Sequence, residues 1–158
     1  MQKSLIFLIL CCAVAGVRPL SAQPMELPNN VRAFQKPLAP EPVAILAMVR
    51  STLVAVDQAN KTGNYTVLRD LAGPKFHAAN NAAALAQIFN ALTSQNIDLL
   101  ATTVVDPEYK SPPTITTQNM LYIAGTFPIA PRPVNFELLF EMESGRWRLF
   151  GVSITPAS

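Results

Sequence analysis

The chain has 158 residues, of which 50% are hydrophobic and 14% are charged, with a formal net charge of +2. This length suits one domain with a substantial hydrophobic core, and this apolar content excludes a disordered chain of the low-hydropathy type. The sequence contains no internal repeat, which excludes solenoid and propeller folds.

The first residues predict an export signal. Lys3 is followed by an apolar run over residues 5–15 and by a stretch of small residues that ends at Ala22. This run is shorter than the ~20 residues that span a bilayer, and it is typical of a secretory signal peptide, here residues 1–22. Cleavage is expected after Ala22, with Ala15 as the second choice. An N-terminal membrane anchor is the alternative.

Removal of residues 1–22 changes both the charge and the cysteine content. Lys3 and Arg18 leave, so the 12 basic residues fall to ten, against 10 acidic residues, and the net charge becomes zero. Cys11 and Cys12 leave as well, so the mature chain would have no disulfide, thiol nucleophile or cysteine metal site. We therefore expect a periplasmic or secreted protein without the basic excess that attracts nucleic acids or membranes.

Residues 23–41 are rich in proline and poor in bulky side chains, which predicts an extended or disordered tether ahead of a domain at 42–156. In the first half of this domain, apolar residues spaced by three and four predict amphipathic helices. The predicted helices span 43–60, 65–71 and 82–93. Val43 begins the inward stripe of the first helix, and Leu68 and Leu71 form that of the second.

The ends of these helices carry recognisable signals. Gly63 ends the first helix, Gly73 and Pro74 end the second, and Asn80 or Asn81 caps the third. After the third helix, β-branched residues predict strands at 97–105 and 116–127, with a proline-containing connection at 108–114 between them. In the second of these strands one face is formed by alternating residues, namely Leu121, Ile123, Gly125 and Phe127.

The stretch 134–154 predicts a β-hairpin with a two-residue turn at Ser144-Gly145. Alternation places Phe136, Leu138, Phe140 and Met142 on one face of the first arm. The turn then sets Met142 opposite Trp147 and Phe140 opposite Leu149. On the other face it sets Glu143 opposite Arg146 and Glu141 opposite Arg148, where opposite charges are expected to form a salt-bridged, solvated surface.

Helices followed by strands predict an α+β fold, with three N-terminal helices packed on a curved antiparallel sheet of about four strands. Three further features are distinctive: the order of the elements, Tyr65-x-x-Leu68, and Phe136-x-Leu138-x-Phe140 followed by Gly145-x-Trp147-x-Leu149-x-Gly151. In these features the chain resembles the nuclear transport factor 2-like superfamily, whose members have a cone-shaped, cystatin-like fold. The resemblance covers about residues 42–155 and points to a small exported bacterial member.

The resemblance implies a pocket between the sheet and the helices, and a homodimer formed through the outer face of the sheet. It is not specific for an activity, because the superfamily includes ketosteroid isomerase, scytalone dehydratase, polyketide cyclases and exported members with no assigned reaction. An enzyme of this kind needs an ionisable group inside the cone. The two candidates are His77, in a predicted loop, and Asp57, near the end of a helix.

Structural or solvated roles account for His77 and Asp57 more simply, so we expect a non-catalytic module, with an isomerase- or cyclase-like enzyme as the alternative. One histidine and no mature cysteine leave no ligand cluster for zinc or iron, and no glycine-rich phosphate loop is present, so no metal or cofactor is expected.

The residues that remain as candidates for ligand binding are mostly apolar. The expected ligand-binding residues are Phe127, Phe136, Phe140 and Trp147, with Tyr65, Tyr122 and His77 as polar contacts. Small-molecule pockets combine apolar walls with a few polar groups, as this set does. A filled hydrophobic core would use the same residues, and that alternative stays open. The expected function is an exported module that binds a small apolar ligand or a protein partner.

Overall fold

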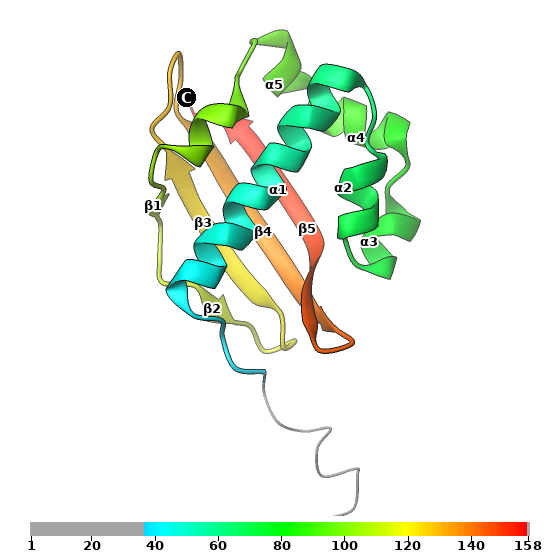
Figure 1. Ribbon diagram of the computed structural model, residues 1–158, viewed down its shortest axis with the longest axis vertical. Helices are drawn as coiled ribbons and strands as arrows, with labels where there is room; N and C mark the ends of the chain where they lie inside the picture. Colours follow the sequence, from blue (N-terminus) through cyan, green and yellow to red (C-terminus); the bar gives the residue numbers. More distant parts are fainter. Residues whose placement is uncertain (1–36, 158) are drawn as a thin grey trace, which may run out of the picture. The chain divides into compact units, whose positions relative to one another are not determined.

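The computed structural model describes residues 37–157, in which helices precede an antiparallel sheet (Figure 1). The predicted signal peptide and residues 23–36 of the predicted tether lie outside this range. The helices are α1 (Pro42–Thr62), α2 (Thr66–Leu71), α3 (Pro74–Ala79), α4 (Ala82–Ile88), α5 (Asn90–Ser94) and the 3-10 helix η2 (Leu99–Thr103). The strands are β1 (Glu108–Tyr109), β2 (Thr114–Ile115), β3 (Leu121–Phe127), β4 (Val134–Glu143) and β5 (Arg146–Pro156). The α+β class and the helices-first order are therefore confirmed.

Helix α1 crosses one face of the sheet (Figure 1). Pro42 begins it, and Gly63 ends it in the left-handed conformation with φ 71°. Its buried stripe runs through Ile45, Val49 and Val56, whereas Val43 is 81% exposed, so the predicted stripe was wrong at its first residue. By length and composition α1 could also cross a membrane, a test that a buried core helix passes too.

The segment after α2 forms a helix that the sequence did not predict. Gly73 and Pro74 were expected to end the second helix and lead into a loop, but Pro74 occupies the first turn of α3, where proline is well tolerated. His77 therefore lies on a helix. The third predicted helix is divided at Phe89 into α4 and α5, and Asn81 caps α4 by accepting a hydrogen bond from the Ala84 N–H at 2.9 Å.

The strand predicted at 97–105 is wrong, because this segment contains η2. Asp98 caps η2 by accepting the Leu100 N–H at 3.0 Å, and the hydroxyls of Thr102 and Thr103 each donate to a carbonyl three residues earlier at 2.7 Å. These local bonds satisfy the backbone without a neighbouring strand and override the β-propensity of the threonines. The connection predicted at 108–114 instead holds β1 and the start of β2.

The sheet has five strands, where about four were predicted, and it is open and not strongly curled, so the predicted curved, cone-shaped sheet is not confirmed (Figure 1). Strands β1 and β2 both pair with β3, β4 is central, and β5 forms an edge. The predicted strand at 116–127 begins only at Leu121. Its inward face is as expected, since Ile123 and Phe127 are buried on the side covered by the helices.

The hairpin of β4 and β5 has the predicted register. Glu143 pairs with Arg146, Met142 with Trp147, Glu141 with Arg148 and Phe140 with Leu149. Ser144 and Gly145 form the turn with φ of 49° and 76°, as a type I′ hairpin turn requires. A register irregularity lies between Leu139 and Phe140, and apolar residues are buried on both sides of it, namely Phe136, Leu138, Phe140, Leu149 and Ile154.

Candidate ligand-binding site

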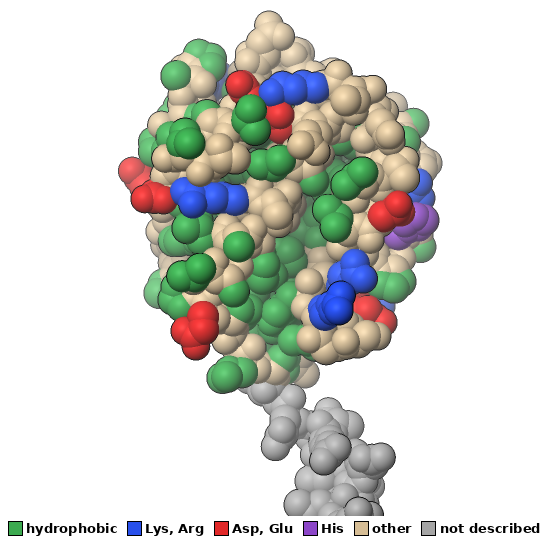
Figure 2. Space-filling view, viewed as in Figure 1, with side chains coloured by type: hydrophobic (Ala, Val, Ile, Leu, Met, Phe, Trp, Pro, Cys, Tyr) green, Lys and Arg blue, Asp and Glu red, His purple; other side chains and the backbone are tan. Residues whose placement is uncertain are grey.

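A groove of about 280 Å³ lies between α1, α2 and the β4–β5 hairpin. We call it the apolar groove, since most of its wall is formed by apolar side chains from these three elements. They include Met48 on α1, Leu68 and Leu71 on α2, and Phe140 and Trp147 on the hairpin. Figure 2 shows hydrophobic side chains in a hollow on this face, with basic side chains at its edge.

Besides Met48, α1 presents only small side chains to the groove, namely Ser51, Thr52 and Ala55. Their polar atoms are largely satisfied, since the hydroxyls of Ser51 and Thr52 donate to the Met48 carbonyl at 3.1 and 2.9 Å. The wall formed by α1 therefore adds little polarity, and the groove suits an apolar group.

Arg146 and Arg148 line one side of the apolar groove and also face a second, more open cleft of about 750 Å³. We call this second space the arginine cleft. Besides these two residues it is lined by Arg69, Asp70, His77 and Glu143. The two spaces thus meet at Arg146 and Arg148, and an apolar surface lies directly beside a cluster of guanidinium groups.

The salt bridges expected across the hairpin are not formed, although the register is as predicted. Glu141 pairs with Lys75 at 3.2 Å instead of with Arg148. Arg148 donates to the backbone carbonyls of Asp70 and Leu71 at 3.4 and 3.3 Å. Arg146 has no ion pair with any residue in the described range. Both guanidinium groups therefore lie beside the groove without a carboxylate partner.

The predicted ligand-binding residues divide between the groove, the core and the outer face of the sheet. Phe140 and Trp147 line the apolar groove. Phe127 and Phe136 are fully buried, with their ring centroids 5.3 Å apart, so they belong to the core. Tyr122 lies opposite Leu139, on the face away from the helices, and burial raises the pKa of its hydroxyl.

Tyr65 is a core residue whose polar group is satisfied inside the protein. Its ring stacks on that of Phe89 at 6.4 Å, and its hydroxyl donates to Asn60 Oδ1 at 2.8 Å. Burial raises the pKa of this hydroxyl above its ordinary value of 10.0, so it stays protonated at neutral pH. The hydroxyl is therefore engaged within the protein, and Tyr65 does not line the groove.

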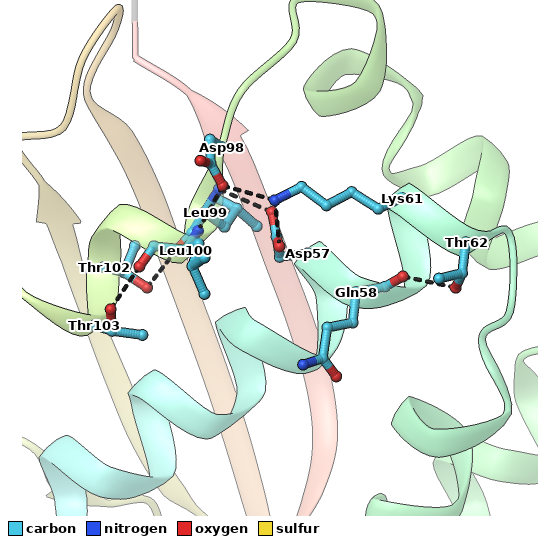
Figure 3. A network of polar contacts seen from close by, with 9 residues as sticks. All are labelled: Asp57, Gln58, Lys61, Thr62, Asp98, Leu99, Leu100, Thr102 and Thr103. Carbon is cyan, nitrogen blue, oxygen red and sulfur yellow. Dashed lines mark hydrogen bonds and ion pairs between the residues drawn. The ribbon is translucent and has the colours of Figure 1, made fainter.

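His77 and Asp57, the two weak catalytic candidates, lie apart from the apolar groove. His77 lines the arginine cleft with its side chain 48% exposed, and its Nε2 is 3.8 Å from Asp70 Oδ1. Asp57 is 4% exposed; its Oδ1 accepts the Leu99 N–H at 3.1 Å and its Oδ2 pairs with Lys61 Nζ at 2.8 Å (Figure 3). Both oxygens of Asp57 are thus engaged, Oδ1 in joining α1 to η2 and Oδ2 in an ion pair within α1.

Lys61 extends this network to Asp98, whose Oδ1 lies 2.9 Å from Lys61 Nζ (Figure 3). The hydrogen bond from Lys61, followed by that from the Leu100 N–H, lowers the pKa of Asp98 below its ordinary value of 3.8. The bond to Asp57, followed by that to Asp98, raises the pKa of Lys61 above 10.5. The depression beside this network, about 380 Å³, shares no lining residue with the apolar groove.

Comparisons with protein-family models, curated proteins and solved structures find no match to this chain. Within residues 37–157, no three His, Cys, Asp or Glu side chains are grouped so that they could hold a metal ion.

Sequence reasoning missed the groove residues on the helices and the role of the arginines. Met48 lies outside the stripe predicted for the first helix, and Leu71 was expected to be buried but is 53% exposed at the groove. Arg146 and Arg148 were assigned to cross-strand ion pairs. One signal was present, since two arginines flank the single tryptophan of the chain at the hairpin tip.

Proposed function

We propose that the protein is an exported, non-catalytic module that binds a small apolar ligand in the apolar groove. The observation that supports this most directly is the groove itself, in which Phe140 and Trp147 are joined by Met48, Leu68 and Leu71. Its volume of about 280 Å³ is close to the lower end of the range for small-molecule pockets, roughly 300–1,000 Å³. This size favours a small molecule over a protein partner.

Kinship with the nuclear transport factor 2-like superfamily is part of this proposal. Its support is the order of helices before sheet and the closing hairpin with Trp147, together with a groove between helices and sheet, where that superfamily has its pocket. The sheet is open and not strongly curled, so the proposal does not depend on a cone.

A catalytic role through His77 or Asp57 has less support. A general acid or base needs to reach its substrate within hydrogen-bond distance and to have a pKa adjusted by its surroundings. His77 is half exposed in an open cleft, and the oxygens of Asp57 already accept bonds from Leu99 and Lys61. A binding role requires no such group.

Titration of the full chain with 1-octanol, followed through tryptophan emission, tests the proposal. Trp147 is the only tryptophan of the chain and lines the groove, so its emission reports directly on occupancy. We expect a saturable change that is weakened about three- to tenfold in Leu71→Gln, because the partly exposed Leu71 adds apolar contact to a bound ligand.

The matched control is Ile88→Gln, since Ile88 is 50% exposed, close to the 53% of Leu71, but does not line the groove. This control is expected to bind 1-octanol as the unchanged protein does. Equal binding by both variants, or the absence of any saturable change, would reject the groove as the binding site.

A further inference from the structure

The basic side chains of the domain divide into two groups. Eight Lys and Arg residues lie between positions 37 and 157. Four of them pair with carboxylates, namely Arg50, Lys61, Lys75 and Lys110. The other four, which have no ion pair with a described residue, are Arg69, Arg132, Arg146 and Arg148. Three of these four line the arginine cleft.

The carboxylates around the cleft do not balance these guanidinium groups. Only Asp70 and Glu143 line it, against Arg69, Arg146 and Arg148. Asp70 Oδ1 lies nearest to His77, at 3.8 Å, and Glu143 forms no ion pair with Arg146 although the two residues face each other across the strands. Three guanidinium groups against two carboxylates leave the cleft with about one excess positive charge.

The donors in the cleft are also incompletely used. The Arg69 Nε atom is buried and has no hydrogen-bond acceptor, while its terminal nitrogen contacts only the Nδ1 and carbonyl oxygen of His77, at 3.5 and 3.4 Å. Arg148 makes only the two long bonds to carbonyl groups at the end of α2. Arg69 and Arg148 are therefore held only by long contacts to neutral groups, whereas a guanidinium group forms its stronger hydrogen bonds with an anion.

We infer that the ligand is a small amphipathic carboxylate, with its apolar part in the apolar groove and its carboxylate at Arg146 and Arg148. This inference rests on the proposed function, because it names the class of ligand for the same groove. Arg146 and Arg148 line both spaces, so one molecule can contact the apolar wall and the guanidinium groups together. The planar guanidinium group matches the two oxygens of a carboxylate, and a single excess positive charge suits a monoanion.

The size of the groove limits the apolar part. Its volume of about 280 Å³ is less than twice the roughly 150 Å³ of an apolar cavity that binds benzene. A short alkyl or aryl acid therefore fits, whereas a two-chain phospholipid would extend far beyond the walls.

Three probes that share an eight-carbon alkyl group and differ in the charge of the head group test the inference, namely octanoate, 1-octanol and octylammonium. Each is titrated into the full chain at pH 7 with Trp147 emission as the readout, and isothermal calorimetry as a second measurement. We expect octanoate to bind about tenfold more tightly than 1-octanol, octylammonium to bind least, and the octanoate affinity alone to fall with added salt.

Arginine variants locate the head group. Arg146→Gln and Arg148→Gln are each expected to lower the octanoate affinity about tenfold while leaving that of 1-octanol unchanged. Arg132→Gln is the control, because Arg132 is exposed and unpaired among the described residues but lines neither space. Should a variant fold poorly, the salt dependence of octanoate binding to the unchanged protein still shows whether a charged contact holds the carboxylate.

The outcomes separate the two proposals. Equal affinity for octanoate and 1-octanol, with no effect of Arg146→Gln or of salt, would overturn the carboxylate inference and leave the apolar groove as a binding site. No saturable response to any of the three probes would overturn both proposals.

Discussion

Asp57 is the only acidic side chain buried among residues 37–157. Its Oδ1 accepts the Leu99 N–H and so joins α1 to η2, while its Oδ2 pairs with Lys61 within α1. Replacement of Asp57 by Ala leaves the Leu99 N–H without its acceptor, so we expect the free energy of unfolding to fall by about 1–3 kcal/mol. Asp57→Asn keeps an acceptor oxygen and is expected to lose less. Urea unfolding of both variants measures this, and equal stability of Asp57→Ala and the unchanged protein would contradict the structural role.

The ion pairs of Lys61 with Asp57 and with Asp98 make stability depend on pH at both ends of the range. The pKa of Asp98 is lowered in the folded protein, so its contribution is present above 3.8 and is lost as pH falls through the folded pKa. The pKa of Lys61 is raised, so its contribution is complete below 10.5 and is lost as pH rises through its folded pKa. Both side chains are more than half exposed, so the effects are modest.

We therefore expect Asp98→Asn to flatten the loss of stability in acid compared with the unchanged protein. Chemical unfolding between pH 3 and pH 7 measures this slope. Glu108→Gln serves as the control, since Glu108 forms no ion pair with a described residue. An acid slope in Asp98→Asn identical to that of the control would show that Asp98 does not cause it.

At the level of elements, the junction of α2 and α3 is attached to the free edge of β5. The Gly73 N–H donates to the Leu149 carbonyl at 2.8 Å, next to a parallel bridge between Ala72 and Leu149. A Cβ atom at Gly73 would lie 2.5 Å from Glu141 Oε1 and 3.4 Å from the Leu149 carbonyl oxygen. A Cβ atom at position 73 would therefore require the Glu141 carboxylate or the junction itself to move.

We expect Gly73→Ala to lower the free energy of unfolding by about 1–3 kcal/mol, because either the junction or the Glu141 side chain must move. The same movement would displace α2 and weaken 1-octanol binding in the groove. Gly151→Ala is the matched control, since its Cβ would meet only the Leu139 side chain at 3.6 Å, an ordinary contact. Thermal unfolding and Trp147 titration of both variants measure these effects, and similar results for the two would contradict the close-approach argument.

The hairpin could be predicted in detail because the information for it is local. The alternation in β4, the turn at Ser144-Gly145 and the two sets of cross-strand pairs all require one register, and a slip by one residue would exchange both faces. The segment of η2 could not be predicted in this way. Its β-branched residues favour a strand, and the contact that fixes it, from Asp57 to Leu99, joins residues 42 positions apart.

The groove depends on a different kind of information. The predicted strand register gives the correct positions of Arg146 and Arg148. Their ion pairs could not be predicted from it, because other basic residues compete for the glutamates opposite them. Lys75 on α3 takes Glu141, and α3 itself was not predicted. The groove also requires the separation between α1 and α2, which follows from packing of the whole domain rather than from either helix.

On the scale of the whole molecule, the outer face of the sheet offers the surface for the predicted homodimer, which remains a prediction. Tyr122, Leu139 and Gly151 adjoin one another in the strand register on this face. We expect Leu139→Glu to shift the protein toward monomer by placing a charge in the interface. Sedimentation velocity measures this, with Ile88→Glu as the control, because Ile88 is exposed on α4 and not on the outer face of the sheet. A monomeric unchanged protein at high concentration would reject the dimer.

The central position of β4 has a consequence for hydrogen exchange. Its amide protons lie between β3 and β5, and its Phe136 and Leu138 side chains are fully buried, so these protons can be replaced by deuterium only when the sheet separates. The free energies of exchange calculated from their protection factors would then equal the global free energy of unfolding, while the two-residue strands β1 and β2 would exchange early. A molecule that binds only the folded state raises that free energy with its concentration, so it would slow exchange throughout β4, including at residues that it never touches.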